Sequence, residues 1–544
     1  MNKNYLLLYR GVIIRVNLSK GFLKHNLMDA LKNLKSKDSK LNLTRTLERR
    51  LSPLNAWSFA FGCVIGWSAF VMPGGVFLPS AGPLGTMIAM EIAALVMLII
   101  SYNYSYMIKK FPQTGGEFLY AQNAFGEKHG FLCAWMLSLS YLSVIPLNAT
   151  ALNLILRAIT GNAFQFGFHY TIAGYHVYFG EMLLAFSALI ILAVIGLFNV
   201  KIIAKLQTYL VMILLTGIIL VLIGVVTSPL SSNNLHPLFY PETPEFHRNA
   251  IVQILAVATT APMSFVGFDT VPQLSEESNF SPDRLKVIMD TSIVCGAFVY
   301  IVLVFIAAAV VPTGYSNWVE YVNNISNLSG VDGIPTLAVA NIVMGKFGLF
   351  CIVSSVIAAM LTGIIGFYMA TSRLLYSMSR NEMIPKWFGH LNKNNVPINA
   401  IIFCMLFSGL TSLLGRATLG WVFDMASTGA AAGFAYTSIA ACKYAWQEKR
   451  TDIIILGAIG FIFAMLFEVL LLVPIPGVNG SLYKESYILL IIWLTLGVIF
   501  YVYTSRRKLR VKFLKTLIQN GGGRITTQKL RKLLRKCFNI KTVI

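Results

Sequence analysis

The sequence predicts an all-α polytopic membrane protein, and three observations support this fold class. Of its 544 residues, 56% are hydrophobic and only 12% are charged, whereas soluble globular domains carry about 25% charged residues. The mean hydropathy is +0.68. Long apolar runs recur along the chain, and each reaches the roughly 20 residues that an α-helix needs to cross the hydrocarbon core of a bilayer.

Polar turns divide the apolar runs into about twelve spans. The expected spans cover residues 56–80, 83–106, 129–157, 181–200, 203–227, 249–274, 285–312, 338–378, 397–415, 419–443, 453–475 and 486–504. An even number of spans places both termini on the same side of the membrane. We expect the first span to direct the chain to the membrane, because Arg10 and Arg15 interrupt the apolar N-terminal stretch and rule out a signal peptide there.

Basic charge is concentrated in two tails. Residues 1–53 hold 12 Lys and Arg against 3 Asp and Glu, and residues 506–544 hold 13 against none, so the tails account for the whole net charge of +22. We expect them to touch anionic headgroups and to flank a transmembrane domain, 54–505. No nucleic-acid-binding module accompanies the charge, so nucleic acid is not an expected partner. A membrane-surface helix and a weakly ordered tail both fit the N-terminal stretch.

Basic residues in the loops predict the orientation. In this topology 14 of them fall on the side of the termini and five on the other side. Because Lys and Arg are enriched in cytoplasmic loops, both termini are expected to be cytoplasmic, in a multi-pass protein of the cell membrane.

The sequence shows no pattern for metal or cofactor chemistry. Its seven cysteines fit neither a CxxC motif nor a metal-ligand spacing. No His/Asp/Glu metal set, Ser–Lys pair or nucleotide-binding loop lies on the spans. We therefore expect no metal and no cofactor, and an enzyme working within the membrane is the least favoured class.

The first span contains residues that interrupt a helix partway across the membrane. They are Gly62, Gly66, Pro73, Gly74 and Gly75, and in a helix interior glycine costs about 1 kcal/mol and proline about 3 kcal/mol. We therefore expect this span to unwind. Unwound backbone at membrane depth is tolerated where it is buried in protein or lines a polar cavity.

The sixth span carries a matching interruption at Pro262, Gly267 and Pro272. Two interrupted helices five spans apart are typical of an inverted-repeat transporter with its binding site at the midplane. Free amides at the start of a half-helix can take a carboxylate, and free carbonyls at the opposing end can take an ammonium group. The alternative is that these residues are packing glycines and proline kinks, which are common in membrane helices.

Asp269 places a carboxyl group inside the sixth span, next to the interruption. Such a group costs about 2.5–3.5 kcal/mol to insert, so it usually faces a polar interior. Three roles stay open: binding a substrate amine, exchanging a proton for coupling, and capping the second half-helix. Glu91 and Glu468 also lie inside spans but without a neighbouring break, and we expect each to be an internal hydrogen-bond partner.

Four ordered motifs resemble those of the amino acid–polyamine–organocation permease family, which has the five-plus-five inverted-repeat, LeuT-like fold. Residues 65–70, Ile-Gly-Trp-Ser-Ala-Phe, resemble the family's Ile-Gly-x-Gly-Ile-Phe break in span 1. Residues 111–120 contain Pro-Gln-Thr-Gly-Gly and resemble its signature after span 2. Residues 265–269, Phe-Val-Gly-Phe-Asp, and residues 370–380 are similar to its motifs in spans 6 and 8. The resemblance covers roughly residues 54–450.

The resemblance implies an alternating-access carrier in which helices 1 and 6 are discontinuous and their broken segments hold the substrate. The amides that would hold a substrate carboxylate are those near Gly66, Trp67, Ser68 and Ala69. The groups that would hold its amino group are the carbonyls near Ser264, Phe265 and Val266, and Gly267 completes the site.

Some positions depart from the family pattern. Trp67 stands where the family usually has a small residue, and Ser68 stands where it has glycine. An indole there would narrow the pocket or offer its face to a cation, which leaves amines and polyamines open as substrates. The alternative is that the indole points away from the pocket into packing. The lysine that some relatives use for proton coupling falls at Leu214, and the hydroxyl that sodium-coupled relatives use falls at Gly363, so the coupling ion stays open.

We therefore expect a secondary active transporter that moves amino acids or related small solutes by alternating access, driven by protons or by a counter-substrate. Within that class, the alternative is an amine or polyamine carrier that uses Asp269 and Trp67. From a different class, the alternative is a transporter-like nutrient sensor that binds solute without moving it. A channel is disfavoured because an occluded site at the midplane suits a carrier.

Overall fold

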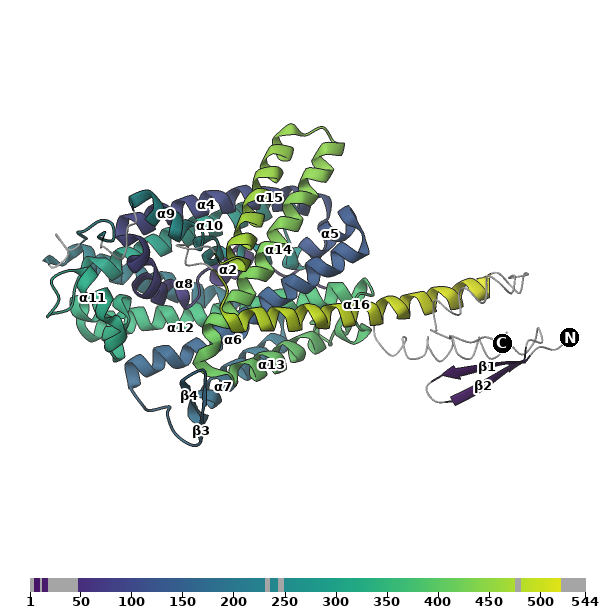
Figure 1. The fold of residues 1–544 in the computed structure, drawn as a ribbon, viewed down its shortest axis with the longest axis horizontal. Helices are drawn as coiled ribbons and strands as arrows, with labels where there is room; N and C mark the ends of the chain where they lie inside the picture. Colours follow the sequence, from purple (N-terminus) through teal and green to yellow (C-terminus); the bar gives the residue numbers. More distant parts are fainter. Residues whose placement is uncertain are drawn as a thin grey trace.

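The structure is a computed structural model, and it describes residues 4–9, 12–17, 47–229, 235–242, 249–474 and 481–519. Within these ranges the chain forms a bundle of long, mostly apolar helices, and its strands are confined to two short hairpins (Figure 1). The predicted all-α fold class is confirmed. Near the N-terminus, β1 (Asn4–Tyr9) and β2 (Val12–Asn17) pair antiparallel, so the surface helix considered for this stretch is wrong for these residues.

The first five predicted spans all fall on helices. The elements of this half are α2 (Pro53–Val64), α3 (Ser68–Met72), the π-helix η1 (Pro73–Phe77), α4 (Leu78–Lys110), α5 (Glu117–Phe125), α6 (Glu127–Thr160), the hairpin β3 (His169–Ile172) and β4 (Tyr175–Tyr178), α7 (Phe179–Phe198) and α8 (Val200–Thr227). Span 1 is therefore interrupted between α2 and α3, next to Gly66 as predicted. Pro73, Gly74 and Gly75 lie in the π-helix η1 and do not break the helical run Ser68–Lys110.

The remaining seven predicted spans also fall on helices. The elements of this half are α9 (Ala250–Ala258), the 3-10 helices η3 (Ala261–Phe265) and η4 (Phe268–Glu277), α10 (Pro282–Ala309), α11 (Trp318–Asn324), η5 (Ile325–Asn327), η6 (Gly330–Gly333), α12 (Pro335–Arg380), η7 (Lys386–Gly389), α13 (Ile398–Ser412), η8 (Gly415–Ala417), α14 (Thr418–Gln447), α15 (Thr451–Leu472) and α16 (Lys484–Gln519). Span 6 is divided among α9, η3 and η4, so helices 1 and 6 are discontinuous as predicted.

Fewer helices are long and apolar enough to cross a membrane than the number of predicted spans. By length and composition, eight helices of the described ranges can cross a membrane, or nine if α9 and the bent 3-10 pair form one span. Part of the difference arises because Ser68–Lys110 counts as one helical run and because α13 has only 15 residues. The chain is a multi-pass membrane protein, and the count of twelve stays a prediction.

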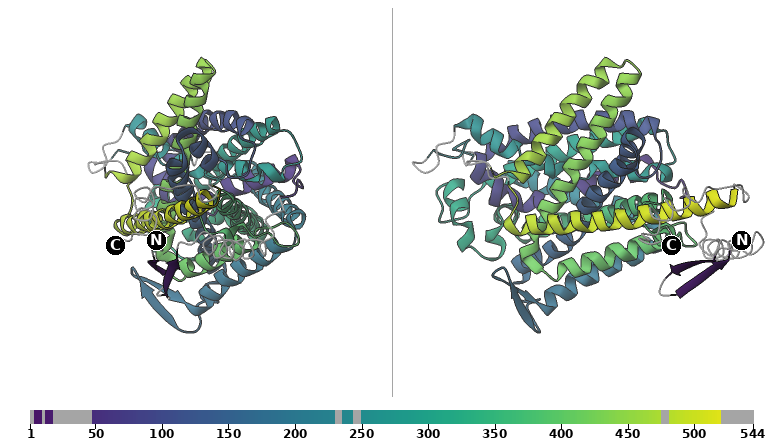
Figure 2. Two further views of the ribbon diagram at one scale, coloured as in Figure 1. Left: turned by 90° about the vertical axis from the view of Figure 1, so that its right-hand side faces the viewer. Right: turned by 45° about the vertical axis from the view of Figure 1, so that its right-hand side comes forward.

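The helices differ in how deeply they lie in the bundle. The most apolar window of α6 is 83% buried, whereas those of α15 and α16 are only 28% and 17% buried. Helices α6, α10 and α12 therefore form the interior, and α15 and α16 lie at the periphery (Figure 2). The exposed apolar side chains of peripheral helices suit contact with lipid.

One end of the bundle gathers the segments 47–52, 111–116, 276–283 and 380–397, and we call it the terminal face. The last part of α16 extends beyond the bundle at this end (Figure 1). Here the amides of Arg50 and Leu51 both donate to the carbonyl of Glu277, at 2.8 and 2.9 Å. Leu51 also forms a parallel β-bridge with Ser278. The segment that leads into α2 is thereby joined to the end of η4.

Two arginine–glutamate pairs connect α12 to η4 at the terminal face. Arg373 donates from Nε and Nη2 to the two carboxylate oxygens of Glu277, at 3.1 and 2.8 Å, and both side chains are fully buried. Seven residues later Arg380 donates to both oxygens of Glu276, at 3.1 and 3.0 Å, but these side chains are 43% and 21% exposed. The same chemistry therefore occurs once in the interior and once at the surface.

We expect Arg373→Ala to lower the free energy of unfolding by about 3–5 kcal/mol, because it leaves the buried carboxylate of Glu277 without its partner. Arg380→Ala is the matched control, since an exposed ion pair contributes about 0–1 kcal/mol. The measurement is thermal unfolding of the purified proteins in detergent. Equal losses for the two variants would contradict a special role of the buried pair.

Candidate functional site

The break in span 1 leaves two backbone amides without partners. Helix α2 ends at Val64, Ile65 is extended with φ −98° and ψ 99°, and α3 begins at Ser68. Among the described residues, no acceptor receives a hydrogen bond from the amides of Gly66 and Trp67. Such orphan donors at the start of a helix form an anion-binding position, and the helix dipole adds to it.

The break in span 6 is a turn between two 3-10 helices. Helix α9 ends at Ala258 and the chain bends by 41° before η3. Val266 and Gly267 form the turn between η3 and η4, and Gly267 has φ +140°. The carbonyl of Val266 accepts no backbone hydrogen bond from the described residues. A free acceptor here lies in the part of the chain where an ammonium group was expected.

Gly267 brings the two breaks into contact. A Cβ atom on Gly267 would lie 2.5 Å from the carbonyl carbon of Cys63 and 2.6 Å from the amide nitrogen of Val64. Only glycine fits both this approach and the positive φ. The eight predicted substrate-site residues, 66–69 and 264–267, therefore lie on two segments that meet here. Their role in binding stays a prediction.

Asp269 stabilises the turn of span 6 in this structure. Its side chain is fully buried. Oδ1 accepts a hydrogen bond from the amide of Gly267 at 2.7 Å, and Oδ2 accepts one from the hydroxyl of Tyr141 at 3.0 Å. Among the described residues it forms no ion pair within 4 Å. Of the three roles that the sequence left open, the bond to Gly267 corresponds to capping, and roles in substrate binding or coupling stay predictions.

Two polar residues near the breaks were missed from the sequence. Tyr300 of α10 is fully buried and faces the side chains of Ser68 and Ser264, yet its hydroxyl has no hydrogen-bond partner in the described part of the chain. Asn148 of α6 has a buried Oδ1 without a partner, which would lie 3.4 Å from a Cβ on Gly66. The signal was present, because both polar residues interrupt apolar spans, but neutral polar residues are common enough in membrane helices that the sequence alone does not single these two out.

Trp67 carries a third unpartnered group. Its indole is half-buried, and Nε1 is buried with no acceptor among the described residues. Buried polar groups in folded proteins are usually hydrogen-bonded. Three such groups beside two helix breaks are the arrangement expected where a polar ligand completes the hydrogen bonding.

A neutral amide joins spans 1, 5 and 8. Gln207 of α8 donates through Nε2 to the carbonyls of Ser58 and Thr362, at 3.2 Å each, and the hydroxyl of Thr362 donates to the carbonyl of Gly62 at 3.1 Å. Leu214, where the sequence placed the lysine position, is buried and apolar. The polar residue of span 5 that reaches the other two spans is therefore Gln207, which carries no charge.

The carboxylates of Glu91 and Glu468 do not form the predicted internal hydrogen bonds. Glu91 is exposed, and Oε2 of Glu468 is buried without a partner among the described residues. That expectation was wrong because position within a span does not determine which way a side chain points.

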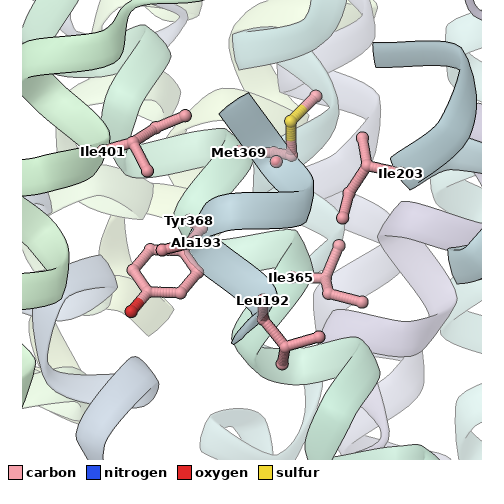
Figure 3. Close-up of a pocket in the computed structure, with 8 residues that line it drawn as sticks. Leu192, Ala193, Ile203, Ile365, Tyr368, Met369 and Ile401 are labelled. Carbon is pink, nitrogen blue, oxygen red and sulfur yellow. The ribbon is translucent and has the colours of Figure 1, made fainter. Parts of the chain in front are cut away.

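A small pocket elsewhere in the bundle is apolar. Its lining residues, from α7, α8, α12 and α13, are Leu192, Ala193, Gly196, Ile203, Ile365, Tyr368, Met369 and Ile401 (Figure 3). The hydroxyl of Tyr368 already donates to the carbonyl of Leu189 at 3.3 Å. A charged solute placed there would lose hydration without gaining hydrogen bonds, so this pocket is not a candidate substrate site.

Comparison with known proteins agrees with the resemblance found in the motifs. Residues 56–512 match the family model described as amino acid permease. The branched-chain amino acid permease BcaP of Lactococcus lactis subsp. cremoris (strain MG1363) is 24% identical over 342 residues, 62% of this chain and 70% of the relative. The γ-aminobutyric acid permease of Escherichia coli (strain K12) is 26% identical over 391 residues, 69% and 76%. The low-affinity putrescine importer PlaP of the same strain is 21% identical over 417 residues, 76% and 84%.

We expect Gly267→Ala to lower the free energy of unfolding by at least about 1–3 kcal/mol, the usual cost of a residue held in a sparsely populated conformation. The close approach to Cys63 adds to this cost. Gly75→Ala is the matched control, because Gly75 is exposed and a Cβ there meets nothing within 4 Å. Thermal unfolding in detergent measures both. A Gly267→Ala variant as stable as Gly75→Ala would contradict the contact between the breaks.

Proposed function

The chain belongs to the amino acid permease family, and we propose on this premise that it is a secondary active transporter of amino acids or related small amines. The names of its relatives describe permeases and an importer, not enzymes. The observation that carries the proposal is the meeting of two broken helices with free backbone groups at Gly66, Trp67 and Val266. Such breaks at the midplane are the expected binding device of inverted-repeat transporters.

In this proposal the two breaks bind opposite ends of one solute. The amides of the span 1 break, at Gly66, Trp67, Ser68 and Ala69, receive the carboxylate. The carbonyls of the span 6 break, at Ser264, Phe265 and Val266, receive the ammonium group, and Gly267 sets the distance between the two segments. Backbone groups satisfy both charges without a fixed counter-ion.

The unpartnered side chains beside the breaks complete this site. The hydroxyl of Tyr300 and Nε1 of Trp67 supply donors, and Oδ1 of Asn148 supplies an acceptor. A solute bound among them replaces hydrogen bonds that these groups otherwise lack. Amines without a carboxylate remain within the proposed range, because the relatives include a putrescine importer.

The proposed cycle alternates the site between the two faces of the cell membrane, with both termini in the cytoplasm. The distribution of basic residues supports this orientation. Protons or a counter-substrate drive transport, and Asp269 is the proposed coupling carboxyl of span 6.

The test is uptake into proteoliposomes of labelled leucine, γ-aminobutyrate and putrescine, each with and without an imposed pH gradient. We expect accumulation of at least one of them, and we expect Asp269→Asn to abolish gradient-driven accumulation more than binding. If the wild-type protein bound one of these solutes but took up none of them, the proposal of a transporter would give way to that of a solute-binding sensor. Accumulation unchanged by Asp269→Asn would remove the proposed coupling role.

We also expect Trp67→Gly to change which solutes compete for uptake, because the substitution removes the indole and its free donor from the site. The measurement is inhibition of labelled uptake by a panel of unlabelled amino acids and amines. Trp57→Gly, on α2 before the break, is the control and should keep the wild-type order of competitors. An identical order for Trp67→Gly would place its indole in packing.

A further inference from the structure

Two carboxyl groups lie buried between the span 6 break and the terminal face. Glu117, the first residue of α5, and Asp269 of η4 are both fully buried. They are close enough that the charge of Asp269 acts on Glu117. In the sequence Glu117 is only one residue of the motif after span 2, because α5 lies between spans and the burial of Glu117 depends on the fold.

The partners of Glu117 are neutral. Oε1 accepts a hydrogen bond from the hydroxyl of Tyr104 at 2.9 Å, and Oε2 accepts one from Nε2 of Gln273 at 2.9 Å. Across the described residues, no Lys, Arg or His lies within ion-pair distance of Glu117 or Asp269. The titratable groups that face the two carboxyls are Cys63 on α2, Tyr104 on α4, Tyr120 on α5, and Cys133 and Tyr141 on α6.

Two buried carboxylates without a cation cannot both stay ionised at low cost. An unpaired buried charge is strongly unfavourable, and a like charge nearby adds to the penalty. Burial, followed by the charge of Asp269, raises the pKa of Glu117 well above its usual range. Burial without a cation therefore favours the protonated, neutral form of Glu117.

Gln273 can stabilise Glu117 in both protonation states. Its Nε2 donates to the carboxylate, and its buried Oε1 has no partner among the described residues. When Glu117 carries a proton, a turned amide accepts the new O–H bond with Oε1, because an amide offers a donor on one side and an acceptor on the other. The hydrogen bond between Gln273 and Glu117 is then kept when the protonation of Glu117 changes.

The position of Glu117 links its protonation to movement at the terminal face. A Cβ on Gly116 would lie 2.7 Å from Cβ of Pro272 and 2.9 Å from Nε2 of Gln273. The loop before α5 is thus in direct contact with η4, which also ends in the buried pair of Glu277 with Arg373. Separation of η4 from this loop would therefore take Gln273 away from Glu117.

We propose that Glu117 takes up and releases a proton in each transport cycle, with Asp269 as the second carboxyl of the pair and Gln273 as a positioning residue. This inference rests on the proposed transport function and deepens it by naming the residue that carries the proton. In uptake, a hydronium ion gives its proton to a carboxylate oxygen of Glu117 and becomes water. In release, hydration lowers the pKa toward its usual value of about 4.3, and the proton returns to water.

The first test is infrared spectroscopy of the full-length protein in detergent, titrated across neutral pH without any solute. We expect the wild type to show the carbonyl band of a buried carboxylic acid, and E117Q to lose it or reduce it. E448Q is the matched control, because Glu448 lies at the same face, is exposed and is paired with Lys110. An undiminished band in E117Q would overturn the proposal.

A second variant keeps the test informative if E117Q folds poorly. Tyr104→Phe removes a donor to the ionised carboxyl, so the midpoint of the band should rise by about one pH unit or more. An unchanged midpoint would show that the titrating group is not Glu117.

The second test is transport, with labelled leucine, γ-aminobutyrate and putrescine as probes. With one proton per solute, a gradient of one pH unit drives accumulation of about tenfold. We expect E117Q to lose this accumulation but to keep exchange of labelled for unlabelled solute, while E448Q keeps both. Gradient-driven accumulation by E117Q would contradict this inference but leave the proposed transport function intact. A wild-type protein that moves none of the probes would count against the proposed function. In that case the infrared band would decide whether Glu117 binds a proton.

Discussion

The close contact of Gly267 with the backbone of Cys63 and Val64 is the constraint on which the rest of the structure depends. Unpaired backbone groups inside a membrane protein are costly, so a broken helix persists only where its surroundings hold it. Here each break supports the other, and Asp269 fixes the turn through its bond to the Gly267 amide. One glycine contact therefore places a free donor region opposite a free acceptor region.

Charge is distributed unevenly along the axis of the bundle. Beside the breaks the side chains of Tyr300 and Asn148 are neutral, and an amide, Gln207, joins three spans. The carboxyl there is that of Asp269, which is bonded to the turn itself. The fully buried ion pair of Arg373 and Glu277 lies toward the terminal face. In the proposed carrier this order would suit transport, because neutral groups would bind a charged solute loosely enough to release it, whereas ion pairs hold helices together.

The sequence predicted the features that depend on local composition. Each predicted span coincides with helices, and the glycine and proline residues predicted both breaks. The features that it missed depend on which segments meet. In the sequence Glu117 looks like a polar loop residue, and only the fold shows that it is buried. Tyr300 looks like one more residue of an apolar span, and only the fold shows that its hydroxyl faces Ser68 and Ser264. Glu468 was misjudged because composition does not fix the face of a helix on which a residue lies.

The bonds from Arg50 and Leu51 to the carbonyl of Glu277 connect the end of the N-terminal tail to η4. The side chain of Glu277 holds α12 while its carbonyl holds the segment before α2. A displacement of η4 must therefore either break these bonds or carry the segment along with it. The segment before α2, which carries the last basic residues of the N-terminal tail, would therefore have to move when η4 moves with these bonds intact.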